Sequence, residues 1–105
     1  MVNMFAYANS FNDDIGSWNV IKVTNMSQMF LDANSFDQDI GSWNVSNAIN
    51  MNSMFQDASS FNQNLGNWYV SNEATMTNMF LNSPLLVTYG TNLEIDEENR
   101  LISST

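Results

Sequence analysis

Carboxylates that recur along the sequence are the residues best suited to chemistry. Asp14 and Asp39 lie 25 residues apart, and Asp37 lies close to the second of them. Carboxylate oxygens can hold Ca²⁺, which takes about six to eight oxygen ligands, but Asp and Asn side chains also form turns. The next copy of this pattern, at Asn62–Asn64, has no acidic residue, and no Asp-x-Asp-x-Asp-Gly loop is present. We therefore predict no metal site, with Asp14, Asp37 and Asp39 as the candidates if there is one.

The composition excludes most enzyme classes. The sequence has no His and no Cys, which removes His-based triads, thiol nucleophiles, disulfides and the usual zinc sites. Two carboxylates could serve a glycosidase, yet nothing distinguishes these acids from turn-forming residues. We expect no catalytic activity and no cofactor. The net charge of −9 argues against nucleic acids and anionic membranes as partners.

The elements that must position these side chains come in copies of 25 residues. All 3 Trp, 7 Phe and 8 Met residues fall in a few columns with that period. The columns are Trp18, Trp43 and Trp68; Phe5, Phe30, Phe55 and Phe80; Phe11, Phe36 and Phe61; Met1, Met26, Met51 and Met76; and Met4, Met29, Met54 and Met79. Bulky side chains that recur at a fixed interval predict identical units stacked around a common core.

Each unit is expected to contain one short helix and one strand. Residues 25–33 carry apolar side chains with the spacing of one helix face. Asn25 suits the N-cap of this helix, and Gln28 suits the third position of a capping box. Residues 40–45 alternate apolar and polar side chains around Trp43 and Val45, which predicts a strand.

Stacked units of this kind predict an α/β fold. We expect a short solenoid in which every 25-residue unit adds a short helix and one strand of a parallel sheet. The solenoid should span residues 1–83, about three and a half units. Pro84 interrupts the fourth copy, and acidic residues crowd the segment 94–98, so residues 84–105 should form a degenerate last unit and an acidic tail. Apolar side chains on an uncovered first unit, such as Met4, favour end-to-end self-association.

The repeat itself resembles that of a known family. The segments 43–47 (WNVSN), 51–55 (MNSMF) and 58–65 (ASSFNQNL) resemble the 25-residue repeat of BspA-like leucine-rich-repeat surface proteins, which also occurs in mycoplasma-type lipoproteins. The resemblance covers residues 1–83. It implies a leucine-rich-repeat-like fold, display at a cell surface or secretion, and a role in adhesion or partner binding. It supplies no catalytic residues. The first residues do not resemble a signal peptide, and no apolar run is long enough to span a bilayer.

A row of polar residues is the candidate binding face. If the Trp and Val residues of each strand face inward, the residues between them face outward. These residues are Ser17, Asn19, Ser42, Asn44, Asn67 and Tyr69. Such rows are common docking surfaces in stacked repeats, and Tyr69 is the expected anchor because aromatic residues are enriched at binding hot spots.

The predicted function is non-enzymatic. We expect a surface-displayed or secreted module that binds a protein or glycan of another cell or of the matrix, without inserting into a membrane. Two alternatives remain open at this point. One is a structural spacer within a longer surface protein, and the other is an acidic module stabilised by calcium.

Overall fold

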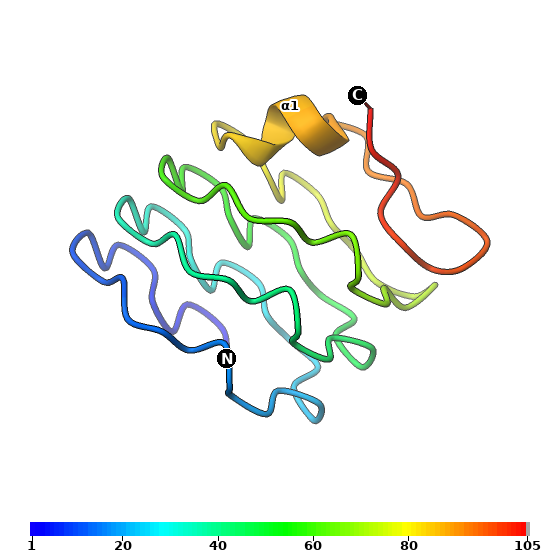
Figure 1. Cartoon of the computed structure of the whole chain (residues 1–105), viewed down its shortest axis with the longest axis horizontal. Helices are drawn as coiled ribbons and strands as arrows, with labels where there is room; N and C mark the ends of the chain where they lie inside the picture. Colours follow the sequence, from blue (N-terminus) through cyan, green and yellow to red (C-terminus); the bar gives the residue numbers. More distant parts are fainter. Residues whose placement is uncertain (105) are drawn as a thin grey trace.

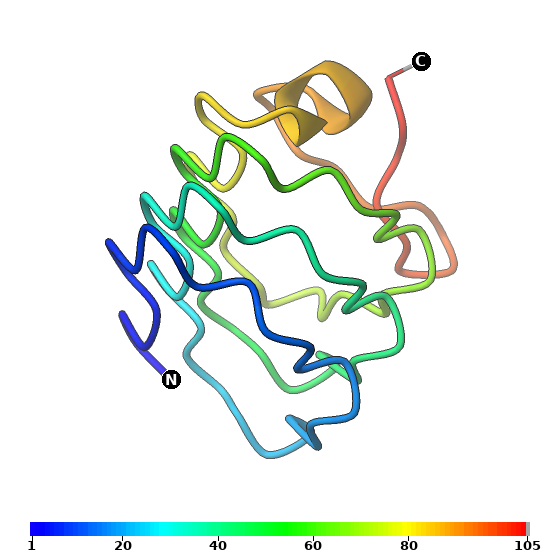
Figure 2. The ribbon, with the colours of Figure 1, turned by 60° about the vertical axis from the view of Figure 1, so that its left-hand side comes forward.

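The protein winds into successive turns that lie side by side, each made by one 25-residue repeat (Figures 1 and 2). The computed structural model describes residues 1–104. Backbone hydrogen bonds join equivalent positions of neighbouring turns. Phe5 N–H donates to Met29 C=O at 2.9 Å, and Phe30 N–H donates to Met54 C=O at 2.9 Å. The copies therefore stack in register, as the spacing of Trp, Phe and Met predicts.

Residues 25–33 do not form the expected helix. The one α-helix within residues 1–104 is α1, Leu85–Tyr89, which follows the stacked repeats. In the repeat, Gln28 has a φ of 56°, in the left-handed region. Met29 N–H donates to Met26 C=O at 3.3 Å, which closes a β-turn instead of a helical bond to the residue four positions earlier.

The helix is absent because alternate N–H groups join this turn of the protein to the next one. Gln28 N–H donates to Asn52 C=O at 3.0 Å, and Asp32 N–H donates to Gln56 C=O at 3.0 Å. These donors cannot also serve an α-helix. The fully buried residues of the segment are Met26, Met29, Phe30 and Ala33. They are the residues that a helix would bury, so burial is predicted correctly while the backbone conformation is not.

The expected strand over residues 40–45 is also absent. Trp43 N–H donates to Ile40 C=O at 3.0 Å and closes a β-turn at the start of this segment. Parallel pairing occurs elsewhere, in isolated bridges. These bridges join Asn25 to Asn50 and Asn50 to Thr75. Residues 1–104 contain no sheet, so the prediction of a leucine-rich-repeat-like α/β solenoid, with one helix and one parallel strand per unit, is wrong.

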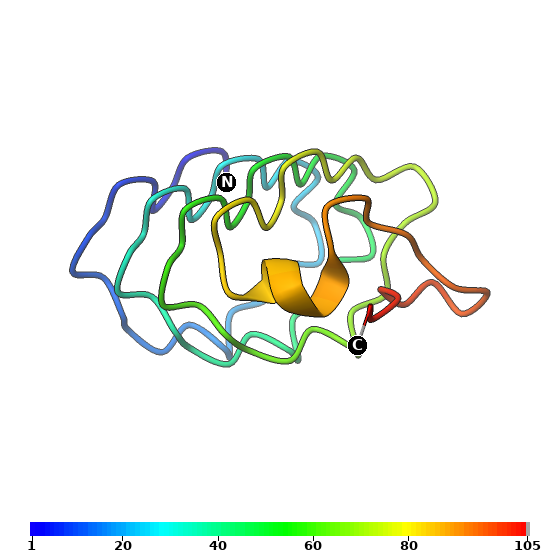
Figure 3. The same cartoon turned by 90° about the horizontal axis from the view of Figure 1, so that it is seen from above.

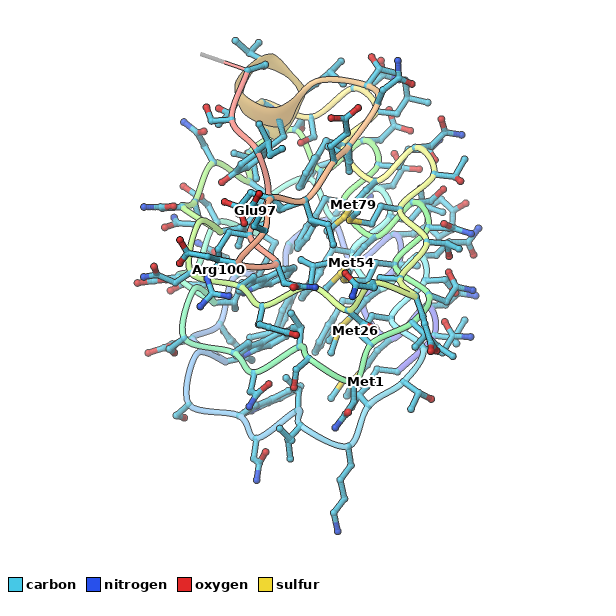
Figure 4. The ribbon with its side chains drawn as sticks, turned by 90° about the vertical axis from the view of Figure 1, so that its right-hand side faces the viewer. Met1, Met26, Met54, Met79, Glu97 and Arg100 are labelled. Atoms are coloured by element: carbon cyan, nitrogen blue, oxygen red, sulfur yellow. The ribbon has the colours of Figure 1, made fainter. Side chains whose placement is uncertain are left out.

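The core consists of aromatic rings stacked both within and between turns. Phe55 lies over Phe30 of the preceding turn with ring centroids 5.4 Å apart, and over Phe61 of its own turn at 4.3 Å. Trp68 lies tilted against Phe55 at 6.2 Å. These four side chains are fully buried. Beside the rings, methionines fill the successive turns, and Figure 4 shows Met1, Met26, Met54 and Met79 one above another.

Residues 84–104 cover the last repeat, and α1 lies across that end of the stack (Figure 3). Pro84, with a φ of −56°, occupies the N-cap of α1, and Gly90 ends the helix with a φ of 80°. The Tyr89 ring packs on Phe80 with centroids 5.4 Å apart. This contact extends the aromatic column into the C-terminal segment.

After α1 the protein forms a narrow loop against the side of the third turn. Ile95 and Leu101 form an antiparallel bridge, and Val70 N–H donates to Asn99 C=O at 2.8 Å. This loop lies within the expected degenerate unit, residues 84–105, of which Thr105 lies outside the described residues. Its contacts place the C-terminal segment beside the predicted binding row.

Candidate binding face

The six residues of the predicted row are all exposed. They are Ser17, Asn19, Ser42, Asn44, Asn67 and Tyr69. Buried residues alternate with them, as in the third turn, where Trp68 and Val70 are both 0% exposed on either side of Tyr69. The alternation has the two-residue period that a strand would give, although no sheet forms. The sequence therefore predicts correctly that these six side chains are exposed, whereas Trp18, for which the pattern predicts an inward side chain, is 37% exposed.

Buried indole groups fix the backbone beneath this row. Trp68 Nε1 donates to Ile40 C=O of the preceding turn at 2.9 Å, and Trp43 Nε1 donates to Ile15 C=O at 3.0 Å. Glycine permits the close approach of the turns at the same level. A Cβ atom on Gly41 would lie 2.9 Å from the backbone oxygen of Asn64. The row thus lies directly above buried hydrogen bonds and closely packed backbone.

A groove of about 370 Å³ lies within the row, between the second and third turns. Its lining residues are Gly41, Ser42, Trp43, Asn44, Asn67 and Tyr69. The structure therefore brings together four residues of the predicted row, whereas Ser17 and Asn19 of the first turn lie outside the groove. None of the lining residues is charged, although the protein has a net charge of −9.

Four of the six residues that line this groove have unpaired backbone groups within residues 1–104. Within residues 1–104, neither the N–H nor the C=O of Ser42, Asn44, Asn67 or Tyr69 takes part in a hydrogen bond. The contrast is with the opposite part of each repeat, where alternate N–H groups are bonded to the next turn. The side chain of Asn67 has no partner among these residues either, while Asn44 Oδ1 accepts bonds from Ser46 N–H at 3.1 Å and Ser46 Oγ at 2.6 Å. The groove therefore offers both donors and acceptors to a ligand.

A comparison with protein families gives a match over most of the sequence. The family model described as "Mycoplasma protein of unknown function, DUF285" matches residues 1–89. The chain belongs to this family. No curated protein and no solved structure matches it. The finer assignment to the BspA-like proteins stays a proposal.

Arg100 lies outside the DUF285 match but reaches the binding face. Its guanidinium carbon lies over the Tyr69 ring, 5.7 Å from the centroid. Arg100 is held in turn by its own loop, because its Nη1 donates to Glu98 C=O at 2.8 Å and its backbone N–H donates to Asp96 Oδ1 at 3.0 Å. Glu97 and Arg100 lie on this same loop in Figure 4. Arg100 is absent from the predicted row, and the one available clue is that it is among only 2 basic residues in the sequence.

The metal candidates of this DUF285 protein form turns. Asp14 Oδ1 accepts a bond from Gly16 N–H at 2.9 Å, and Asp39 Oδ1 accepts one from Gly41 N–H at 2.8 Å. Asp37 Oδ1 instead accepts a bond from the backbone N–H of Asn62 on the next turn. Within residues 1–104, no group of three or more His, Cys, Asp or Glu residues is placed to hold a metal ion.

No helix in the described part of the protein is both long enough and apolar enough to cross a membrane.

Proposed function

We propose that this protein is a non-enzymatic binding module that holds its partner at the groove between the second and third turns. The observation that supports this most directly is the run of unpaired backbone groups beside the exposed rings and amides of the groove. Elsewhere, backbone hydrogen bonds join neighbouring turns, so the polar groups that remain unpaired here are available to a ligand. The lack of His and Cys in the sequence supports a binding role over a catalytic one.

The proposal includes display at a cell surface or secretion, with a protein or glycan of another cell or of the matrix as the partner. Support comes from the resemblance of the repeat to that of BspA-like surface proteins, for which an adhesive role is the implied one. The net charge of −9 supports a partner other than nucleic acid or an anionic membrane. A groove of about 370 Å³ is small, so adhesion would rely on several weak contacts acting together.

Binding of the labelled 105-residue protein to immobilised matrix proteins and glycans tests this proposal. Tyr69→Ala removes a groove side chain that is 46% exposed. Asn67→Ala removes a side chain that makes no hydrogen bond within residues 1–104. Folding should therefore be preserved in both variants. We expect both variants to lose at least tenfold in affinity. Matched controls are Val87→Ala on α1, which is 76% exposed, and Asn92→Ala in the loop that follows.

The same experiment separates the binding module from a structural spacer. A spacer needs only the stacked turns and no ligand at the groove. Identical binding profiles for the wild type and the groove variants would therefore reject the binding proposal and favour the spacer.

A further inference from the structure

We propose that the ligand of the groove is a neutral saccharide. This inference rests on the binding function proposed above and adds the chemical class of the ligand. The groove is lined by Gly41, Ser42, Trp43, Asn44, Asn67 and Tyr69, and none of these residues is charged. Charged residues make up only 12% of the sequence, so the weight of the argument falls on the chemistry of the groups that line this groove.

The uncharged lining argues against an ionic ligand. No Lys or Arg lines the groove for a phosphorylated or sulfated ligand, and no carboxylate lines it for a basic peptide. Arg100 contacts Tyr69 from outside the lining, and its guanidinium is engaged over the Tyr69 ring. Sugar hydroxyl groups need neither, because each can donate one hydrogen bond and accept others.

The polar groups of the groove can pair with a sugar hydroxyl group whether it donates or accepts the hydrogen bond. Asn67 offers an unpaired amide, with a carbonyl that accepts and an NH₂ that donates. Asn44 Nδ2 makes no bond within residues 1–104, while Asn44 Oδ1 is held by Ser46 at 3.1 and 2.6 Å, which fixes the orientation of the NH₂ group. The unpaired backbone N–H and C=O groups of Ser42 and Tyr69 add donors and acceptors at fixed positions.

Tyr69 supplies the apolar surface that a sugar ring needs. The C–H groups of a pyranose ring form an apolar face, which packs well against an aromatic ring. The Tyr69 side chain is 46% exposed and lines the groove, while Arg100 lies over its ring at 5.7 Å. A ring held by a cation–π contact loses little side-chain freedom when the ligand binds. Arg100 is thus a positioning residue for Tyr69.

The size of the groove sets the size of the ligand. A volume of about 370 Å³ is near the lower end of small-molecule sites, which span about 300–1,000 Å³. It would accommodate one or two sugar rings of a longer polymer. A folded protein partner would instead require a standard interface of about 800 Å² on each side.

Saturation-transfer NMR with the 105-residue protein tests the inference. The probes are the neutral tetrasaccharides of a glucan, a mannan and a galactan, with an oligogalacturonate as the anionic comparison. We expect transfer to at least one neutral probe and none to the oligogalacturonate. Tyr69→Ala and Asn67→Ala should weaken binding at least tenfold, and Arg100→Ala about threefold, while Val87→Ala and Asn92→Ala should leave it unchanged.

Three results would overturn the saccharide assignment: no transfer to any neutral probe, preference for the anionic probe, or binding that survives Tyr69→Ala. Failure of the assignment remains distinct from failure of the binding function. If no saccharide binds but a matrix protein is held by the wild type and lost in Tyr69→Ala and Asn67→Ala, the groove is a protein-binding site. If neither class of ligand responds to these substitutions, both proposals are wrong.

Discussion

Trp68 Nε1 donates a hydrogen bond of 2.9 Å to the backbone C=O of Ile40, which lies one turn earlier in the stack. Trp43 and Ile15 form the same bond at 3.0 Å. Both indoles are almost completely buried, so neither the N–H nor the C=O can turn to water if its partner is removed. This repeated bond ties neighbouring turns together directly beneath the binding face.

Trp68→Phe should therefore destabilise the protein strongly. The change removes the N–H donor, leaves Ile40 C=O unpaired and opens a cavity, at a cost of about 2–4 kcal/mol in the free energy of unfolding. Urea unfolding measures this loss. Trp18→Phe is the control, because Trp18 is 37% exposed and its indole makes no hydrogen bond within residues 1–104. Similar losses at the two positions would show that the inter-turn bond adds nothing.

Gln28→Gly distinguishes the observed turns from the expected helix by the sign of its effect. Gln28 has a φ of 56°, which costs a non-glycine residue about 1–2 kcal/mol, so glycine should leave stability unchanged or raise it by up to about 1 kcal/mol. In a helix the same substitution would cost about 1 kcal/mol. Thermal or urea unfolding of the purified variant gives the sign.

The neighbouring Ser27→Gly serves as the control for this substitution. Ser27 does not have a positive φ, so glycine there brings only the entropic cost of about 0.5–1 kcal/mol. If Gln28→Gly were as destabilising as Ser27→Gly, the left-handed conformation at Gln28 would be contradicted.

The sequence predicts the core of this protein better than its backbone. The period places Met29 and Phe30 inside, and both are fully buried. A helix face and a succession of β-turns bury residues at the same spacing, so apolar pattern alone cannot separate them. The clue that could have done so lies in the column of Gln28, where Asn3 and Asn78 also have positive φ. Asn is the non-glycine residue that most readily adopts this conformation.

For the binding face as well, the sequence predicts which side chains are exposed but not how the backbone arranges them. Alternation predicts that Asn44 and Tyr69 are exposed, because exposure depends on the local backbone direction. The groove between them depends on how two turns fail to pair, and the contact of Arg100 with Tyr69 depends on where the last loop folds back. The Arg100 contact does not repeat along the sequence, so no periodic pattern could indicate it.

Asp37→Asn should be tolerated, whereas Asp37→Ala should not. Asp37 Oδ1 accepts bonds from Asn62 N–H at 3.0 Å and Gln63 Nε2 at 2.8 Å, and Asn12 Oδ1 has the equivalent role one turn earlier. Asn keeps the acceptor and removes one negative charge, so stability should change by less than about 0.5 kcal/mol. Ala removes the acceptor and should cost about 1 kcal/mol in urea unfolding.

Asp13→Ala is the matched control for Asp37, since Asp13 is exposed and makes no hydrogen bond within residues 1–104. It should change stability by less than about 0.5 kcal/mol.

Addition of calcium should leave the melting midpoint of the wild type unchanged, because the Asp37 oxygen serves the inter-turn bonds. A rise in the midpoint that is lost in Asp37→Asn would instead support a calcium-stabilised module.

The direction of the inter-turn hydrogen bonds leaves complementary groups unpaired in the first and last repeats. One column of bonds runs from Asn3 N–H to Ser27 C=O at 3.2 Å, and from Ser53 N–H to Thr77 C=O at 2.9 Å. Within residues 1–104, the column starts at an unpaired acceptor, Val2 C=O, and ends at an unpaired donor, Asn78 N–H. Asn78 also lines a groove of about 420 Å³. Two first turns facing one another would oppose acceptor to acceptor. Although residues 84–104 cover the last repeat, the groove at Asn78 leaves one edge of it open, so association should be head to tail through that edge.

Val2→Lys should therefore weaken self-association of the 105-residue protein at least tenfold in sedimentation velocity. Val2 is 48% exposed, and a lysine there would put a strongly hydrated charge beside the unpaired carbonyl groups. Ile49→Lys is a close control, because Ile49 is β-branched and 47% exposed but lies on the side of the stack, where its N–H is already bonded to Thr24 C=O. A wild type that stays monomeric at high concentration, or equal effects of the two substitutions, would contradict head-to-tail association. A loss of association confined to Val2→Lys would support it. The two side chains are similarly exposed, but only Val2 lies beside an unpaired backbone carbonyl group.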